Sequence, residues 1–303
     1  RLAGSLQVGG QEHFYLEGQV AYAIPQEQGQ WLVHSSTQHP GEVQHWIAHA
    51  LGLESHRITV QCRRMGGGFG GKETQAGHMA VWACLAARKF AQPVKLRLDR
   101  DDDFIITGKR HPFEYDYTVG FDGSGLILGL QLMMAANCGF SADLSGPVAD
   151  RAIFHADNAY YLSDVEIVSH RCKTHVQSQT AFRGFGGPQG MIVIEAIMGD
   201  IARHLGLDPL AVRRRNFYGV GSRDVTHYQM KVEDNILAPL VDALARSSDY
   251  ERRRAELARF NAGSPLIKRG IALTPVKFGI SFTATLFNQA GALVHVYTCL
   301  LYT

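Results

Sequence analysis

The same tetrapeptide, Gly-Phe-Gly-Gly, occurs twice in this chain, at residues 68–71 and 184–187. Glycine adopts backbone conformations that other residues avoid, and it lets main-chain N–H groups reach a ligand without a Cβ in the way. Each copy precedes a segment with helical spacing, and the N-terminus of a helix carries partial positive charge. Two such loops predict a cradle that grips one large anionic ligand from two sides. The alternative is two tight turns without a ligand, although ordering so many glycines is costly.

The composition is that of an ordinary soluble globular protein. The 303 residues are 46% hydrophobic and 19% charged, with a formal net charge of +2. This balance gives no electrostatic reason to expect nucleic acid or an anionic membrane as a partner, and no apolar stretch approaches the ~20 residues of a membrane span. The five cysteines include no Cys-x-x-Cys pair, which favours reduced thiols in the cytoplasm over an iron–sulfur or zinc site. The chain starts at Arg1, so we expect it to be an internal piece of a longer protein.

Hydrophobic periodicity predicts a mixture of strands and helices. Residues 113–121 alternate apolar and polar side chains and are followed by an Asp-Gly-Ser-Gly turn, which is typical of a β-hairpin. Further strands are expected at 13–24, 31–35, 57–62, 94–99, 126–136 and 164–172 and from about 270. Helices are expected at 41–51, from the first loop to about 90, at 188–205, from 209 onward and at 236–260. We therefore predict an α+β fold rather than strictly alternating βαβ units.

Two familiar phosphate-binding patterns nearly fit the first loop. Residues 66–72 match G-x-x-x-x-G-K, but the next residue should be Ser or Thr and is instead Glu73, which would repel a phosphate. The same stretch matches G-x-G-x-x-G, but the nearest suitable acidic residue, Asp99, lies too far along the chain for a dinucleotide fold. Neither pattern accounts for the second loop.

Side chains beside the two loops suggest a ligand-binding role. Arg183 lies inside the second loop, where its planar guanidinium can bind an oxyanion or a carbonyl. Phe69 and Phe185 project from glycine runs, where they can contact a planar ligand. Glu73 stands near the start of a predicted helix, where the dipole favours its anion. The simpler alternatives are a surface arginine and a helix-end charge.

Several motifs together identify a family resemblance. Residues 64–73 and 180–190, supported by 9–14, 36–38, 107–112 and 277–282, resemble the molybdopterin-binding region of the xanthine dehydrogenase/aldehyde oxidase family. The motifs occur in one order between residues 9 and 298. The resemblance implies part of a molybdenum hydroxylase of the xanthine dehydrogenase type, which converts hypoxanthine and xanthine toward urate.

The resemblance also implies a cofactor site. Gln38, Phe69 and Arg183 match family positions around the molybdenum centre. The glycine loops would bind the molybdopterin itself. The loop glycines assigned to this binding are Gly68, Gly70 and Gly184.

The substrate site follows from the same resemblance. Glu73 and Arg151 match the pair that contacts the purine and takes part in catalysis, and Phe185 matches an aromatic residue that packs on it. An Arg at a ring carbonyl stabilises negative charge that develops on the ring, and a Glu opposite it accepts or shares a ring N–H proton. Related aldehyde oxidases share the glycine loops but lack this polar pair, which favours a purine substrate. The alternatives are an aldehyde- or other N-heterocycle-oxidising relative and a non-catalytic molybdopterin- or nucleotide-binding module.

Other functional parts of the family are missing from this sequence. The 2Fe-2S clusters and the FAD that receive the electrons are expected on a partner subunit of an oligomeric enzyme. The catalytic base of the family is a Glu in a Gly-Glu-Pro-Pro context, which does not occur here. The chain alone is therefore expected to be inactive.

The expected domain organisation has three parts. Residues 1–260 are predicted to form a first molybdopterin-binding domain, and residues 261–298 the start of a second one. Residues 299–303, Cys-Leu-Leu-Tyr-Thr, replace the Asp-Gly turn that the family pattern requires. They resemble a translated sequencing adapter, so we expect a non-native tail.

Overall fold

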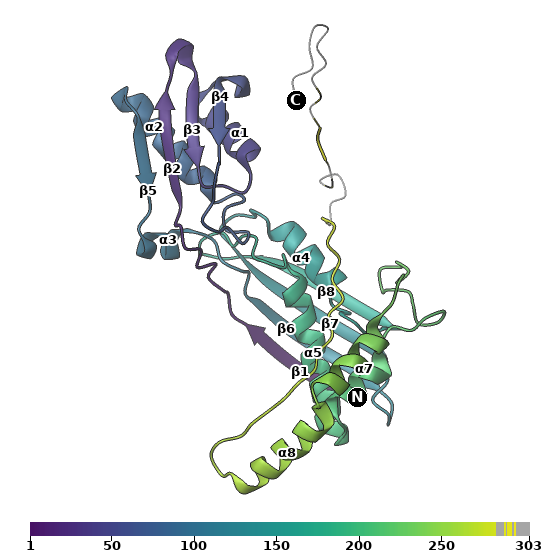
Figure 1. The fold of residues 1–303 in the computed structure, drawn as a ribbon. Coiled ribbons are helices and arrows are strands. Elements are labelled where there is room, and N and C mark those ends of the chain that lie inside the picture. Colours follow the sequence, from purple (N-terminus) through teal and green to yellow (C-terminus); the bar gives the residue numbers. More distant parts are fainter. Residues whose placement is uncertain (283–287, 289, 293, 295–303) are drawn as a thin grey trace.

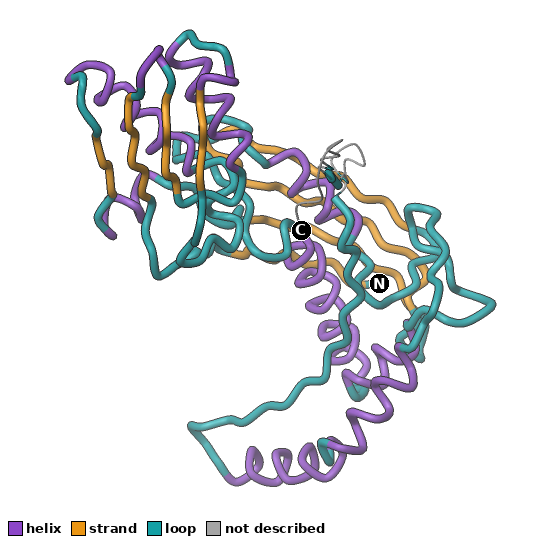
Figure 2. The backbone as a smooth tube through the Cα atoms, turned by 45° about the horizontal axis from the view of Figure 1, so that its top comes forward, coloured by secondary structure: helices purple, strands orange, loops and turns teal. Residues whose placement is uncertain are grey.

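The computed structural model describes residues 1–282, 288, 290–292 and 294. They form two lobes, each built on a four-stranded mixed sheet with helices packed against it (Figures 1 and 2). The predicted α+β architecture is confirmed. Among the helices that the described residues form, none combines the length and hydropathy that a membrane span requires.

The smaller lobe contains β2 (Val20–Pro25), β3 (Trp31–Ser35), β4 (Ile58–Gln61) and β5 (Val94–Arg97), in the sheet order β4-β3-β2-β5. The parallel pair β3 and β4 is connected through α1 (Pro40–Leu51), and α2 (Ala76–Phe90) packs beside α1 on the same sheet. Helix α1 starts with a proline in its first turn and ends at Gly52, whose φ of 64° is the left-handed cap that glycine favours. Buried Val33, Ile47 and Met79 join the sheet to both helices.

The larger lobe contains β1 (Leu2–Val8), β6 (Phe113–Phe121), β7 (Ile127–Gly139) and β8 (Val165–Lys173), in the order β1-β6-β7-β8. The first two pairings are antiparallel, and β8 runs parallel to β7 after a crossover through α4 (Ser145–Phe154). Helix α5 (Gly187–Leu205) packs on the inner face with Ile194, Ile197 and Ile201 fully buried. Full burial of each such side chain contributes about 1.5–3 kcal/mol.

The hairpin of β6 and β7 also positions the second glycine loop. The side chains of β6 alternate between buried and exposed, as predicted, and its register with β7 pairs Phe113 with Ala136. Buried Tyr115 donates a hydrogen bond from its hydroxyl to the carbonyl of Gln189 at 2.7 Å. Since Gln189 lies in the first turn of α5, this bond ties the loop at 184–187 to the sheet.

The remaining elements lie around the two sheets. They are α3 (Arg100–Ile106), α6 (Pro209–Asn216), α7 (Leu237–Ser247), α8 (Tyr250–Gly263) and the short 3-10 turns η1 (Glu27–Gly29) and η2 (Ser55–Arg57). Helix α6 starts as its sequence predicts, because the carboxylate of Asp208 accepts a hydrogen bond from the N–H of Ala211 at 2.9 Å.

Some predicted elements differ from the structure. The strand expected at 13–24 begins only at Val20, and the helical segment 236–260 is two helices interrupted at Asp249, where φ is 51°. Residues 264–282 form no strand, contrary to the strands expected from about 270. The later part of the segment expected to form strands from about 270, beyond residue 282, lies largely outside the described residues, and the tail 299–303 lies wholly outside them.

Candidate functional site

The two Gly-Phe-Gly-Gly copies fold into the same turn. In each copy the N–H of the last glycine donates to the carbonyl of the first, at 2.8 Å in residues 68–71 and 2.9 Å in residues 184–187. The phenylalanine and the next glycine have φ values of 54° and 99° in the first copy and 50° and 98° in the second. Positive φ at both central positions defines a type I′ turn. A phenylalanine in this region is strained by roughly 1–2 kcal/mol, and such strain is typical of functional sites.

The two turns touch each other. The N–H of Arg183 donates to the carbonyl of Phe69 at 2.9 Å. A Cβ on Gly70 would lie 2.7 Å from the backbone of Ala181, so only glycine allows this approach. His13 reinforces the junction, because its Nε2 lies 2.7 Å from the carbonyl oxygen of Ala181. Segments more than a hundred residues apart in the sequence therefore form one site.

Gln38 completes the first turn. Its side-chain Oε1 accepts from the N–H groups of Gly70, at 2.9 Å, and Lys72, at 3.2 Å. The same side chain fills the space where a Cβ on Gly68 would stand, 2.5 Å from its Oε1. Gln38 is thus joined to the turn that contacts Arg183 through Phe69. The structure therefore brings together Gln38, Phe69 and Arg183, the three residues assigned to the molybdenum surroundings.

Lys72 does not face a ligand. Its side chain is fully buried, and its Nζ donates to the carbonyl of Glu17 at 2.7 Å and to the hydroxyl of Ser36 at 2.8 Å. A carboxylate oxygen of Glu17 lies 3.3 Å from Nζ and also accepts from the N–H of Gly66 at 2.8 Å. Burial lowers the pKa of Lys72, although the Glu17 carboxylate opposes this shift. The lysine thus anchors the loop, and the G-x-x-x-x-G-K match does not make a phosphate site.

The second turn is held mainly by α4 and by Arg110. A Cβ on Gly186 would lie 2.0 Å from the carbonyl oxygen of Val148, so the turn packs directly on helix backbone. Arg110 stacks over the ring of Phe182 at 4.0 Å and donates to the carbonyl of Arg183 at 2.9 Å. Its burial lowers the pKa of Arg110 to about 10. The guanidinium of Arg183 itself is exposed and forms no hydrogen bond or ion pair with any described residue.

Glu73 follows the first turn directly, with its N–H pointing at the carbonyl of Gly70 at 3.5 Å. It lies ahead of α2, which begins at Ala76, and it is partly buried. Burial and the negative charge of Asp143 raise the pKa of Glu73 to about 7. Desolvation therefore outweighs the dipole stabilisation that its position suggests. At neutral pH this carboxyl group is poised between its two protonation states.

Arg151 belongs to the other side of the site. It is 4% exposed, near the end of α4, and its guanidinium donates to the carbonyls of Gly279, at 2.5 Å, and Ser281. The guanidinium lies 5.8 Å from the ring of Phe185. Its Nε is buried without a partner among the described residues. Among the described residues, no hydrogen bond or ion pair joins Glu73, which follows the first turn, to Arg151, which lies in α4.

Two aromatic residues at this site lack a predicted role. The ring of Phe282 lies 5.3 Å from that of Phe185 at an interplanar angle of 50°, and the ring of Phe278 lies 5.4 Å from the Arg151 guanidinium. Both belong to the motif at 277–282. Their membership of that motif was the only hint in the sequence that they belong to the site. No local sequence pattern indicates that this segment lies against α4.

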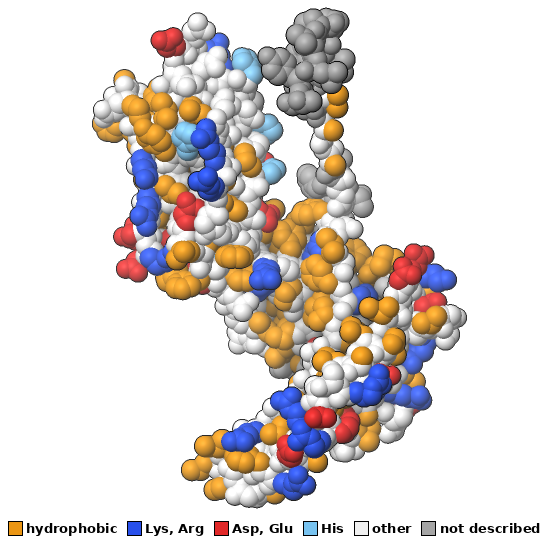
Figure 3. Space-filling model, in the orientation of Figure 1, with side chains coloured by type: hydrophobic (Ala, Val, Ile, Leu, Met, Phe, Trp, Pro, Cys, Tyr) orange, Lys and Arg blue, Asp and Glu red, His pale blue; other side chains and the backbone are white. Residues whose placement is uncertain are grey.

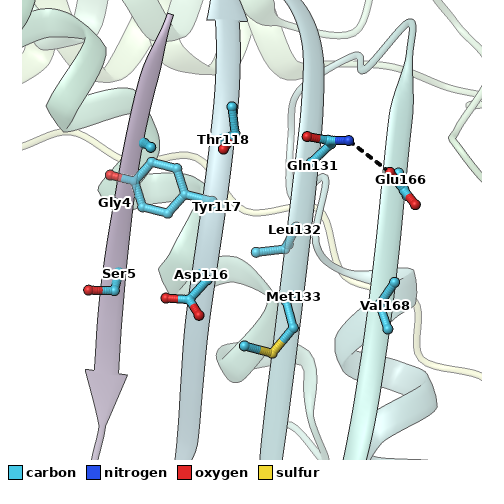
Figure 4. Close-up of a pocket in the computed structure, with 11 residues that line it drawn as sticks. Gly4, Ser5, Asp116, Tyr117, Thr118, Gln131, Leu132, Met133, Glu166 and Val168 are labelled. Carbon is cyan, nitrogen blue, oxygen red and sulfur yellow. Dashed lines mark hydrogen bonds between the residues drawn. The ribbon is translucent and has the colours of Figure 1, made fainter.

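The rest of the surface shows no comparable arrangement among the described residues. Hydrophobic side chains gather where the two lobes meet, in the orientation of Figure 1 (Figure 3). A shallow hollow of about 610 Å³ lies on the open face of the larger sheet (Figure 4), where Gln131 donates to Glu166 at 3.0 Å. None of the turn residues lines it. The described residues contain no cluster of three or more His, Cys, Asp or Glu side chains suited to a metal ion.

Two glycine turns in contact, beside the exposed Arg183, are an arrangement suited to an anionic cofactor. The chain belongs to the molybdopterin cofactor-binding domain family: one family model of that description matches residues 1–217, and a second matches residues 243–299. Both glycine turns, Gln38 and Arg151 lie within the first match.

Curated relatives are similar over nearly the whole chain. It is 46% identical over 294 residues to xanthine dehydrogenase of Drosophila subobscura, and 48% identical over 298 residues to xanthine dehydrogenase/oxidase of Gallus gallus. These alignments cover 97% and 98% of this chain but 22% of each relative. The chain therefore spans about a fifth of the length of these relatives. The resemblance to xanthine dehydrogenases is confirmed.

Solved structures show the same fold. Aldehyde oxidoreductase from Desulfovibrio gigas matches with a TM-score of 0.76 and 27% identity, over 88% of this chain and 28% of that one. Reconstituted CO dehydrogenase from Oligotropha carboxidovorans matches with a TM-score of 0.76 and 20% identity, over 86% of this chain and 33% of that one. The second similarity concerns the fold alone.

Proposed function

We propose that this chain is the molybdopterin-binding part of a xanthine dehydrogenase-type molybdenum hydroxylase, which oxidises hypoxanthine and xanthine toward urate. The observation that carries the proposal is the direct bond between the two glycine turns, from the N–H of Arg183 to the carbonyl of Phe69. This bond brings the two glycine motifs that resemble those of xanthine dehydrogenases into a single site.

The donors at this junction fit an anionic cofactor. The N–H groups of Gly67, Gly68 and Phe69 have no hydrogen-bond partner among the described residues, and the guanidinium of Arg183 is exposed. Main-chain N–H groups and a planar guanidinium are the donors that bind phosphate and oxyanions. The amide of Gln38, Phe69 and Arg183 would surround the metal end of the cofactor. When bound, the cofactor supplies a two-electron oxidation that adds oxygen to a ring carbon.

The chain's own residues would bind and polarise the purine. Arg151 brings a positive charge that stabilises negative charge on a ring carbonyl. Glu73, with a pKa raised to about 7, can accept or share a ring N–H proton near neutral pH. Phe185 would fix the plane of the ring, which reduces the entropy cost of reaching the reactive geometry.

The remaining functions would come from outside residues 1–303. We propose that 2Fe-2S clusters and FAD on a partner subunit carry the electrons away, in an oligomeric enzyme of the cytoplasm. The general base would be a Glu in a Gly-Glu-Pro-Pro context, which this sequence lacks. The chain alone would then have no turnover.

A second candidate is an aldehyde- or N-heterocycle-oxidising hydroxylase. It is supported by the similarity to aldehyde oxidoreductase from Desulfovibrio gigas, which is 27% identical. The polar pair of Glu73 and Arg151 separates the two candidates. An aldehyde needs no pair of groups that recognises ring N–H and carbonyl positions, whereas a purine does.

The test uses the full-length, cofactor-loaded enzyme that contains this chain. Glu73→Gln and Arg151→Met are each expected to lower kcat/KM for xanthine by ~100-fold or more, the loss typical of removing one transition-state contact. Glu166→Gln, on the open sheet face, is the matched control and should leave kcat/KM unchanged. Equal activity of all three variants on xanthine, or faster turnover of benzaldehyde than of xanthine by the unmodified enzyme, would favour the second candidate.

A further inference from the structure

Residues 275–282, here called the strap, cross α4 in an extended form without pairing to any described strand. Instead, alternate residues bond to side chains that follow one another along residues 151–158. Asn158 donates to the carbonyl of Pro275 at 2.9 Å and accepts from the N–H of Lys277 at 3.1 Å. Arg151 donates to the carbonyls of Gly279 and Ser281. Side chains of one segment thus take the place that a partner strand would have beside this segment, which was expected to be a strand.

His155 closes this ladder into a ring. Its Nε2 lies 3.0 Å from the N–H of Gly279, and its Nδ1 lies 2.9 Å from the carbonyl oxygen of Arg151. Arg151 in turn donates to the carbonyl of Gly279. The imidazole also packs against the ring of Phe278, with centroids 4.8 Å apart. Three residues therefore hold one another in place through three hydrogen bonds.

The ring fixes the protonation state of His155. A main-chain N–H can only donate, so Nε2 must accept and carry no proton, and Nδ1 must carry the proton that reaches the Arg151 carbonyl. Burial lowers the pKa of His155 below 6.5, which favours this neutral form. The charged groups around it are Arg151 and Lys277, which also lower the pKa, and Asp157, which raises it. Protonation would remove the acceptor for Gly279.

We propose that His155 is a positioning residue for the substrate site: its neutral imidazole holds the strap, and through the strap the guanidinium of Arg151. The inference rests on the proposed function insofar as Arg151 contacts the purine. Without the bond to Gly279, the strap carbonyls that bind the guanidinium shift away, and Phe282, which packs on Phe185, moves with them. His155 itself touches no cofactor or substrate in this account.

Two variants separate positioning from simple packing. His155→Gln keeps one donor and one acceptor and does not titrate, whereas His155→Phe keeps the aromatic volume against Phe278 but has neither. In the full-length enzyme, hydrogen–deuterium exchange of a peptide covering 275–282 should rise by roughly tenfold in His155→Phe, the change expected from losing one or two hydrogen bonds, and should stay close to the unmodified level in His155→Gln. A peptide covering 66–72, in the other turn, is the internal control and should not change.

Activity and pH give the second readout. His155→Phe should lower kcat/KM for xanthine by roughly tenfold, while His155→Gln restores most of it. Protonation of His155 removes the acceptor for the N–H of Gly279. Protection of the strap from exchange, relative to the control peptide, should therefore fall as the pH drops from about 6.5 through the lower native pKa of His155. This pH dependence should vanish in His155→Gln. Unchanged strap exchange in His155→Phe, or the same pH dependence in His155→Gln, would overturn the inference. The exchange measurement tests the role of His155 whether or not xanthine is the substrate. The two proposals can therefore be contradicted independently.

Discussion

The two Gly-Phe-Gly-Gly turns have the same backbone but different surroundings. Their φ values agree within a few degrees, and both are closed by the same hydrogen bond between the first and last glycine. The first turn is held by side chains, namely Gln38 from a distant segment and the adjacent, fully buried Lys72, whose Nζ contacts the partly exposed Glu17. The second lies directly on the backbone of α4 and continues into α5 through Pro188.

This difference shows that the repeated tetrapeptide determines the backbone conformation of the turn. The residues packed around each copy determine which groups it contacts. In the first turn, the side chain of Gln38 accepts from the N–H groups of Gly70 and Lys72, and the N–H groups of residues 67–69 have no partner among the described residues. The second turn has little freedom, because backbone atoms of α4 occupy the space next to Gly186. We therefore expect the second turn to tolerate added volume less well than the first, where a Cβ on Gly70 would lie 2.7 Å from the backbone of Ala181.

The largest effect should come from adding a methyl group to the second turn. In Gly186→Ala, the new Cβ would lie 2.0 Å from the carbonyl oxygen of Val148 at a φ of 98°. Strain and overlap together should cost about 4 kcal/mol or more. The same change at Gly70, whose Cβ would lie 2.7 Å from Ala181, should cost roughly 2–3 kcal/mol. Thermal unfolding of both variants of the full-length protein tests this order, and a larger loss at Gly70 would contradict it.

The residue after each turn gives the second comparison. Lys72→Met would leave the carbonyl of Glu17 and the hydroxyl of Ser36 without their buried donor, at a cost of about 2 kcal/mol, while the partly exposed Glu17 carboxylate can return to water. Pro188→Ala, at the equivalent position after the second turn, removes only a favourable first-turn residue and should cost less than ~1 kcal/mol. Equal shifts of the unfolding temperature in the two variants would show that Lys72 is not the anchor.

The third prediction concerns Glu73, next to the first turn. Its pKa is raised to about 7 in the folded chain, so the folded state is penalised as the pH rises from about 4.5 to about 7, and the penalty stays constant above that. Glu73→Gln should therefore stabilise the protein by roughly 1–2 kcal/mol at pH 8, after allowance for partial exposure, and have little effect at pH 4.5. Asp143→Asn, which removes the repelling charge, should give a smaller gain of the same sign. A stability loss at pH 8 in Glu73→Gln would contradict the raised pKa.

The smallest effect should come from the aromatic residue at each turn tip. Phe69→Gly and Phe185→Gly both relieve a positive φ, which gains roughly 1 kcal/mol. Phe69 is 48% exposed, so little packing is lost and the net change should be slightly stabilising. Phe185 packs against Phe282 and Arg151, so its loss of contacts should cancel the gain. Chemical denaturation of the two variants should differ by less than ~1 kcal/mol; a marked destabilisation by Phe69→Gly would show that its ring is held inside the protein.

Much of the fold follows from local patterns in the sequence. The alternation at 113–121 gives the bounds of β6, and residues 31–35 coincide with β3, because each pattern matches a half-buried strand. Helix α4 was not predicted, since a glycine and a proline in its first turn mask the helical spacing. Strands were expected from about 270 after a linker-like segment, but the bonding partners of residues 275–281 are the side chains of Arg151, His155 and Asn158.

The site was predicted less completely than the fold. Motif resemblance selects Gln38, Phe69 and Arg183, and the structure places them together. The contact that does this, between the carbonyl of Phe69 and the N–H of Arg183, joins segments too far apart for any local pattern to register. The pKa of Glu73 is raised mainly by burial and secondly by Asp143 from another segment, so the direction of the shift could not be read from position relative to a helix.

The central claim, that the two turns form one molybdenum-cofactor cradle, is tested most directly by metal content. The full-length protein and its Gln38→Ala/Arg183→Ala variant would be purified in parallel and analysed for molybdenum by plasma mass spectrometry. The unmodified protein should contain near-stoichiometric molybdenum, and the variant should lose most of it. Because Gln38→Ala also removes the bonds to the N–H groups of Gly70 and Lys72, the unfolding temperature of the variant is measured alongside. Full molybdenum retention by a folded variant, or no molybdenum in the unmodified protein, would contradict the claim.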